Sequence, residues 1–158
     1  RKMTQSNRLE DVIPAYDNPL YRAALAILGD PQEAEDVVQE AFLRLWEKDP
    51  AFESPAHQRS WLLKVTVNAC KSRLRSPWRR RTAPLLESYP AADAEEQAVL
   101  EVIQSLPPKD RAALHLYYYE GYQTAEIAAM TGWREGTVRS RLARARDKLR
   151  ELLKGEWE

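Results

Sequence analysis

The sequence has a single cysteine, Cys70, and only two histidines, which limits the chemistry that the protein can carry out. One cysteine cannot form an internal disulfide, and its scarcity is typical of proteins in a reducing cytoplasm. Cys70, His57 and His115 do not have the spacing of a metal-ligand set. We therefore expect no metal and no other cofactor.

Long apolar runs and catalytic motifs are also missing. No segment approaches the roughly 18 consecutive apolar residues of a membrane helix, and no signal peptide is recognisable at the start. The sequence contains no phosphate-binding loop and no recognisable nucleophile–base pair. We expect a cytoplasmic protein that is not an enzyme and has no small-molecule substrate.

The formal net charge is +0, but the charges are unevenly distributed. Residues 57–82 contain eight Lys/Arg and no acid, and residues 134–150 contain seven Lys/Arg and two acids. Residues 30–53 contain eight acids against two bases, and residues 87–101 contain five acids and no base. A single basic segment is usually a solvated helix face. Two of them separated by acidic segments suggest two polyanion contacts, with other surfaces available to a different partner.

Apolar residues recur at helical spacing, and no strand-like alternation persists, which predicts an all-α protein. We expect prolines 14 and 19 to interrupt the N-terminal segment, so that the first helix runs from Asn18-Pro19 to Gly29. Asp30-Pro31 predicts the start of a second helix. A loop over residues 49–58 and a third helix over about residues 59–75 should follow. The residues expected to face inward on the first two helices are Leu20, Ala23, Ala24, Ile27, Leu28, Val37, Val38, Ala41, Phe42, Leu45 and Trp46.

Two small helical domains are expected, joined by a flexible linker. Residues 83–93 contain two prolines and lack periodicity, as interdomain linkers do. The first domain would then cover residues 1–82 and the second residues 94–158. Pro107-Pro108 and Glu120-Gly121 should interrupt the helices of the second domain.

Residues 123–146 have the pattern of a helix-turn-helix. Residues 126–130 predict a short helix, and Gly132 predicts a sharp turn with positive φ. The inward stripe expected on the next helix is Val138, Leu142, Ala145, Leu149 and Leu152. The opposite face carries Arg139, Ser140, Ala143, Arg144 and Asp147. In such a motif the second helix enters the major groove, where arginine pairs with guanine or phosphate. Arg134 is a poor N-cap, which leaves the helix start open as far as Thr137.

Four segments of the second domain closely resemble domain 4 of bacterial sigma factors: Leu106-Pro107-Pro108-Lys109, Tyr119-Glu120-Gly121-Tyr122, Glu126-Ile127-Ala128 and Gly136-Thr137-Val138-Arg139-Ser140-Arg141-Leu142. In that family this domain recognises the −35 promoter element and binds the flap of the polymerase β subunit. The resemblance implies −35 contacts by Arg139, Ser140, Ala143 and Arg144.

The first domain resembles sigma domain 2, on the residues Ala34-Glu35-Asp36-Val37-Val38-Gln39-Glu40-Ala41-Phe42. Asp36, Gln39 and Glu40 are spaced at i, i+3 and i+4, so they share a helix face opposite the apolar one. The resemblance implies that they bind the coiled coil of the polymerase β′ clamp. Without the resemblance, this would be an ordinary acidic solvent face.

Residues 59–74 resemble the −10 recognition and melting segment of the same family. Asn68 matches a residue that helps to recognise a flipped base, and residues 51–58 would complete the base pocket. The −10 contacts implied are Trp61, Lys64, Asn68, Lys71, Arg73 and Arg75, with weaker phosphate contacts from Arg79, Arg80 and Arg81. Trp61 could stack on a base, but a tryptophan at helical spacing more often belongs to the core, and Cys70 is interpreted as a small buried or half-buried residue.

The direct connection of domain 2 to domain 4 resembles the extracytoplasmic-function (ECF) sigma factors. The resemblance implies a promoter-specificity subunit with RNA polymerase core, promoter DNA and an anti-sigma factor, often membrane-anchored, as partners. Two other classes stay open: a dimeric helix-turn-helix regulator that binds duplex DNA without polymerase, and a helical adaptor whose basic faces bind only proteins.

Overall fold

A computed structural model describes residues 5–76 and 101–157. The regular structure in these two ranges is helical and contains no strand. The chain divides into two compact units, residues 1–83 and 84–158. The predicted linker over 83–93 and the arginines at 79–81 lie outside the described residues.

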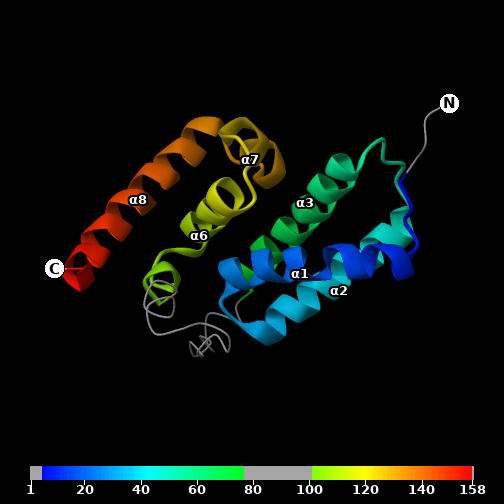
Figure 1. Ribbon diagram of the computed structural model, residues 1–158, viewed down its shortest axis with the longest axis horizontal. Coiled ribbons are helices and arrows are strands. Elements are labelled where there is room, and N and C mark those ends of the chain that lie inside the picture. The colour runs from blue at the N-terminus through cyan, green and yellow to red at the C-terminus, as the bar shows by residue number, and fades with distance from the viewer. Residues whose placement is uncertain (1–4, 77–100, 158) are drawn as a thin grey trace. The chain divides into compact units, whose positions relative to one another are not determined.

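In its described residues, unit 1 has three packed helices: α1 (Leu9–Leu28), α2 (Pro31–Lys48) and α3 (Pro55–Leu74) (Figure 1). The core lies where they meet, and its largest fully buried side chains include Leu20, Leu28, Leu45, Leu62 and Leu63. All the inward positions expected for the first helix are buried. On α2 they are buried too, apart from Trp46, which is 66% exposed.

Helix α1 is longer than expected, because it begins at Leu9 and continues through Pro14 and Pro19. The prediction that these prolines interrupt the segment is wrong. A proline inside a helix removes one hydrogen bond and costs about 3 kcal/mol. Burial of Val12 and Leu20 in the core offsets this cost, because each apolar side chain of this size contributes about 1.5–3 kcal/mol when fully buried.

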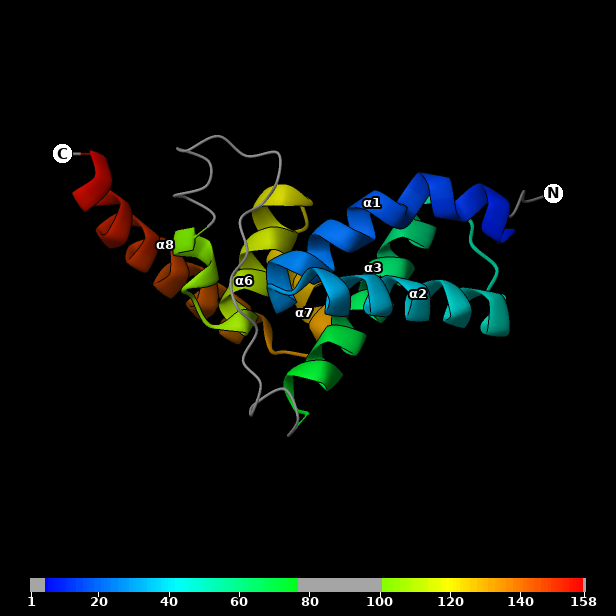
Figure 2. The same ribbon diagram turned by 90° about the horizontal axis from the view of Figure 1, so that it is seen from below.

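Helix α2 begins as predicted. Asp30 is its N-cap, Pro31 occupies the first turn, and the Asp30 side chain accepts a hydrogen bond from the backbone N–H of Gln32 at 2.9 Å. The turn before it is short because Gly29 has a φ of 72° and ends α1 in the left-handed conformation. Figure 2 shows α1 and α2 lying side by side.

Helix α3 begins at Pro55, four residues earlier than predicted, because Ser54 caps it by accepting from the N–H of His57 at 3.1 Å. The loop before α3 is therefore shorter than predicted, and the N-terminal segment is hydrogen-bonded to this loop. The Asn7 amide donates to the Pro50 carbonyl at 2.6 Å, and the Gln5 N–H donates to the Phe52 carbonyl at 3.1 Å. Phe52 is fully buried.

Unit 2 contains α6 (Pro108–Leu114), a turn of π-helix η1 (His115–Tyr119), α7 (Thr124–Thr131) and α8 (Glu135–Trp157). Its core includes Leu106, Leu116, Ile127, Val138 and Leu142. The predicted breaks are present at Pro107 and at Gly121, which has a φ of 81°. The buried Arg111 secures the turn before α6 by donating to the Leu106 carbonyl at 2.6 Å.

The turn between α7 and α8 confirms the helix-turn-helix pattern. Gly132 ends α7 with a φ of 80°, as predicted, and α8 begins at Glu135 rather than near Thr137. Val138, Leu142 and Ala145 are buried, but Leu152 is 42% exposed. Its predicted inward position is wrong because the C-terminal turns of α8 run beyond α6 and α7, as Figure 1 shows.

Candidate polymerase and nucleic-acid interfaces

The acidic face of α2 is solvent-accessible. Gln39 is exposed, and Asp36 and Glu40 are partly exposed, while Val37, Val38 and Ala41 on the other side of the helix are buried. The capped start and the buried side of α2 therefore present these three side chains together, in the arrangement that the i, i+3, i+4 spacing predicts.

Two large apolar side chains extend this face towards the end of α2. Leu43 is 55% exposed and Trp46 is 66% exposed. They lie four and seven positions after Gln39, which places all three on one side of the helix. Leu43 was not predicted from the sequence and Trp46 was predicted to lie in the core, because the apolar stripe of α2 is wider than the surface that α1 and α3 cover.

Acidic residues at the start of α2 act on the Tyr21 phenol of α1. Burial raises the pKa of Tyr21, and the charges of Glu35 and Asp30 raise it further, because each disfavours the phenolate. Tyr21 lies on α1 and so reports on acidic residues of the neighbouring helix. Their field is of the sign that would attract a basic partner.

The predicted −10 residues of α3 separate into two groups. Lys64, Asn68 and Arg75 are exposed and Lys71 is partly exposed, and their spacing places them on one side of the helix. Arg73 is also partly exposed, but it follows Ala69 and Cys70 by four and three positions and so lies on the opposite side of the helix. The structure thus brings four of the polar residues together but not Arg73.

Trp61 lies at the start of the same stripe and is half-buried. Its ring packs edge-on against buried Phe52, with centroids 5.7 Å apart, and His57 contacts the same phenyl ring at 5.1 Å. Trp61 therefore supports the loop before α3 and still presents part of its ring to solvent. The core interpretation fits the part of the ring that packs on Phe52, and the contact of Trp61 with −10 DNA stays a prediction.

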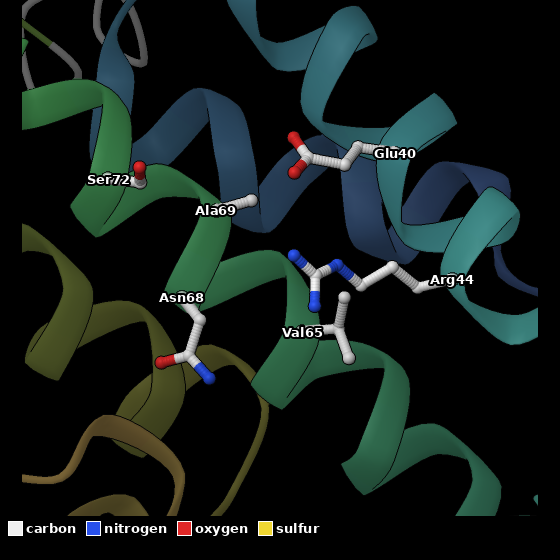
Figure 3. A pocket seen from close by; sticks show the side chains of 6 residues that line it. All are labelled: Glu40, Arg44, Val65, Asn68, Ala69 and Ser72. Atoms are coloured by element: carbon white, nitrogen blue, oxygen red, sulfur yellow. The ribbon is translucent and has the colours of Figure 1, made fainter. Parts of the chain in front are cut away.

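A hollow of about 140 Å³ lies beside Asn68, between α2 and α3. It is lined by Glu40, Arg44, Val65, Asn68, Ala69 and Ser72. Figure 3 shows the Glu40 carboxylate and the Arg44 guanidinium extending from α2 towards α3. Sequence analysis missed Arg44 and Ser72, although Arg44 follows Glu40 by one helical turn. The predicted pocket residues 55–58 instead form the first turn of α3, where Gln58 is buried.

The outer face of α8 carries the predicted −35 residues. Arg139, Ser140, Ala143 and Arg144 are all exposed. The buried Val138, Leu142 and Ala145 fix the other side of the helix against α6 and α7. Arginines therefore flank small residues on this face, and its contact with −35 DNA stays a prediction.

Glu135 and Thr124 orient one of these arginines. The Arg139 guanidinium lies 2.9 Å from the Glu135 carboxylate, and the Thr124 hydroxyl donates to the same oxygen at 2.9 Å. This contact joins the start of α7 to the start of α8. Sequence analysis passed over Glu135, although its i, i+4 spacing from Arg139 is a recognisable ion-pair signal.

Arg141 is turned inward, unlike its neighbours on α8. It forms a 2.9 Å ion pair with Asp110 of α6, and its guanidinium lies 5.6 Å from the centre of the Trp133 ring. Asp110 is buried. These contacts fix the orientation of α8 relative to α6, so Arg141 supports the outer face without belonging to it.

Within the described residues, no group of three or more His, Cys, Asp or Glu could hold a metal ion. None of the helices in the same part of the chain combines the length and apolar character of a membrane span.

Comparison with protein families places both units in one class. Residues 12–80 match sigma-70 region 2, and residues 96–149 match sigma-70 region 4. These matches define a sigma factor, a promoter-recognising and non-catalytic initiation factor of RNA polymerase.

Comparison with individual relatives assigns the chain to a subgroup of the sigma factors. The chain is 40% identical over 143 residues to the ECF RNA polymerase sigma factor SigM of Mycobacterium tuberculosis, covering 87% of this chain and 73% of that protein. It is 32% identical over 156 residues to the RNA polymerase sigma-E factor of Streptomyces coelicolor, covering 91% and 85%. The chain belongs to the ECF sigma factors.

Solved structures agree on the fold. The sigma factor RpoE of Bartonella quintana, in complex with the anti-sigma factor NepR, has a TM-score of 0.76 at 24% identity, covering 94% of this chain and 98% of that one. CnrH in complex with the cytosolic domain of CnrY has a TM-score of 0.64 at 24% identity, covering 93% and 88%.

Proposed function

We propose that the chain binds core polymerase through the acidic face of α2 and through unit 2, and recognises a promoter with two cationic faces. The α3 face would bind the −10 element and favour its melted form, and the outer face of α8 would bind the −35 duplex. The observation that carries the proposal is the pairing, in unit 1, of an acidic face on α2 with a cationic face on α3.

The −10 assignment rests on the chemistry of the α3 face. Lys64, Lys71 and Arg75 place positive charges along a line on either side of Asn68. Cations in a line bind a strand's phosphates, and an exposed amide can both donate to and accept from the edge of an unstacked base. Capture of unpaired bases shifts the equilibrium towards open DNA without any catalytic step. The chain itself then needs no cofactor and catalyses nothing.

The polymerase assignment rests on the α2 face. Asp36, Gln39 and Glu40 supply acceptors and negative charge to a basic helical partner, and Leu43 and Trp46 supply apolar area. Mixed surfaces of this kind are typical of protein interfaces. We further propose an anti-sigma factor as a partner that covers the same face and keeps the protein inactive; the sigma factor RpoE of similar fold was solved in complex with the anti-sigma factor NepR. The protein would act in the cytoplasm with the polymerase.

Two variants test the proposal in run-off transcription with purified core polymerase on a promoter library. Asn68→Ala should impair open-complex formation more than binding to core, because its amide acts only on exposed bases. Asp36→Lys with Glu40→Lys should abolish binding to core. Equal losses of both activities for Asn68→Ala, or unchanged core affinity for the double variant, would refute the respective assignment.

A matched control is available on α1. Glu10→Lys with Asp17→Lys likewise replaces two acids on one helix by lysine, but on α1, where both acids are exposed. It should leave core binding and initiation intact. Gel shifts on duplex DNA with and without core separate the proposal from the dimeric-regulator alternative, which predicts specific binding without core.

A further inference from the structure

Gly136 is the second residue of α8, and no contact within the described structure requires a glycine there. It is absent from the residues with positive φ, which are Gly29, Asp49, Gly121 and Gly132. A β-carbon built on Gly136 would meet no heavy atom within 4 Å. Glycine is also a poor helix former, because it loses more backbone freedom than alanine. The fold of the chain therefore does not explain this residue.

Gly136 lies on the side of α8 that would face DNA. It precedes Arg139 by three positions and Ser140 by four, so all three share the exposed side of the helix. Arg139 and Arg144 make this side cationic, and both are exposed. The absent side chain therefore leaves free space where a polyanionic duplex would approach.

The dimensions of a helix in a groove explain why one methyl group would matter. An α-helix with its side chains is about 10–12 Å across, and the major groove of B-DNA is about 12 Å wide. Little space is left between the helix and the groove walls. A side chain on the approaching face must either find room or hold the helix further out.

We propose that Gly136 contacts the wall of the major groove of the −35 duplex, and that its missing side chain determines how deeply α8 enters. This inference rests on the proposed function, in which α8 recognises the −35 element. Gly136 would then contribute to −35 binding by having no side chain, whereas Arg139 and Arg144 would contribute by charge and hydrogen bonding.

The test uses the full chain bound to core polymerase. Wild-type protein first selects a promoter from a duplex library, and the same promoter with a scrambled −35 element serves as the reference. The measured quantity is the affinity ratio of the two promoters for wild type, Gly136→Ala and Gly136→Gln. Thermal unfolding of each free protein gives its stability.

Gly136→Ala should unfold at a temperature at least as high as wild type, yet its affinity ratio should fall roughly fivefold or more, the loss expected of one base-pair contact. Gly136→Gln should lose more, because its side chain is longer. Affinity for core should not change. Gly121→Ala is the matched control: with a φ of 81° it should lower the unfolding temperature while the folded protein keeps its affinity ratio.

Each result decides one claim. If wild type shows no −35 dependence, the proposed role of α8 fails and this inference fails with it. If wild type depends on the −35 element but both Gly136 variants keep its affinity ratio, only the inference is refuted. A lower unfolding temperature for Gly136→Ala would also refute it, because the fold itself would then require the glycine.

Discussion

The ion pair between Arg141 and Asp110 gives the clearest test of how unit 2 holds α8. Arg141→Met removes the guanidinium and keeps an unbranched side chain of similar length. The carboxylate of Asp110, only 9% exposed, then loses its 2.9 Å partner. The stacking of the guanidinium on Trp133 is lost as well. We expect α8 to loosen from α6.

The size of the effect follows from burial. Removing one partner of a fully buried ion pair costs roughly 3–5 kcal/mol, whereas an exposed pair contributes about 0.2–1 kcal/mol. Arg141 is 21% exposed, so the pair lies between these cases, and we expect unit 2 to lose about 2 kcal/mol. For a small domain this corresponds to a decrease of roughly 8–16 °C in unfolding temperature.

Hydrogen exchange of the α6 and α8 amides measures this loss in unit 2 alone, and calorimetry gives the unfolding temperature. The control is Arg150→Met, which breaks the pair with Asp147 whose side chains are 77% and 75% exposed. It should change stability very little. Asp110→Leu combined with Arg141→Met should recover part of the loss, because no charge is left buried. An Arg141→Met effect no larger than that of Arg150→Met would refute the reasoning.

Three further predictions concern unit 1. Lys71→Gln should weaken the salt dependence of binding to single-stranded −10 DNA. The slope of the logarithm of the binding constant against the logarithm of the salt concentration, measured by fluorescence titration, should fall in magnitude by about 0.7. An unchanged slope would mean that Lys71 contacts no phosphate. Pro14→Ala should stabilise unit 1 by about 2 kcal/mol in urea unfolding. Relief of the roughly 3 kcal/mol helix cost of a proline is partly offset by up to about 1 kcal/mol, because alanine leaves the unfolded chain more flexible. Glu35→Gln should lower the raised pKa of Tyr21, measured as the difference in phenolate absorbance from Tyr21→Phe. The folded protein holds the Tyr21 proton more tightly than the unfolded chain, whose tyrosines titrate near pH 10. The free energy of unfolding should therefore be unaffected by Tyr21 below about pH 10 and should fall at higher pH.

Local signals in the sequence predicted the features that depend on local geometry. Asp30-Pro31 identified the start of α2, and Gly132 identified the turn of the helix-turn-helix, because capping and positive φ depend on single residues. The exposed residues of α8 followed from helical periodicity alone. The family resemblance then supplied roles for these faces that spacing could not supply.

Features that depend on tertiary packing were not predictable in the same way. Pro14 and Pro19 suggested a break, but packing against α2 and α3 keeps α1 continuous. Trp46 lies at the edge of an apolar stripe that is wider than the surface covered by α1 and α3, and Leu152 lies where α8 runs beyond α6 and α7. Periodicity gives the direction of a side chain, but not whether another helix lies in that direction.

The Ser54-Pro55 start of α3 was missed, although it is a local signal. A capping serine followed by proline is as informative as Asp30-Pro31. It was obscured because the apolar periodicity of α3 becomes clear only after Arg59. Four residues that seemed to be loop are therefore helix, and this changes which side chains lie near Asn68.

The contact between Glu135 and Arg139 has a consequence for the thermodynamics of promoter binding. An unrestrained arginine loses up to about 2 kcal/mol of rotamer entropy when it becomes fixed. In this protein the carboxylate of Glu135 already restricts Arg139, and Thr124 restricts the carboxylate. Part of that ordering thus takes place during folding, so that a duplex meets a side chain with fewer conformations left to lose.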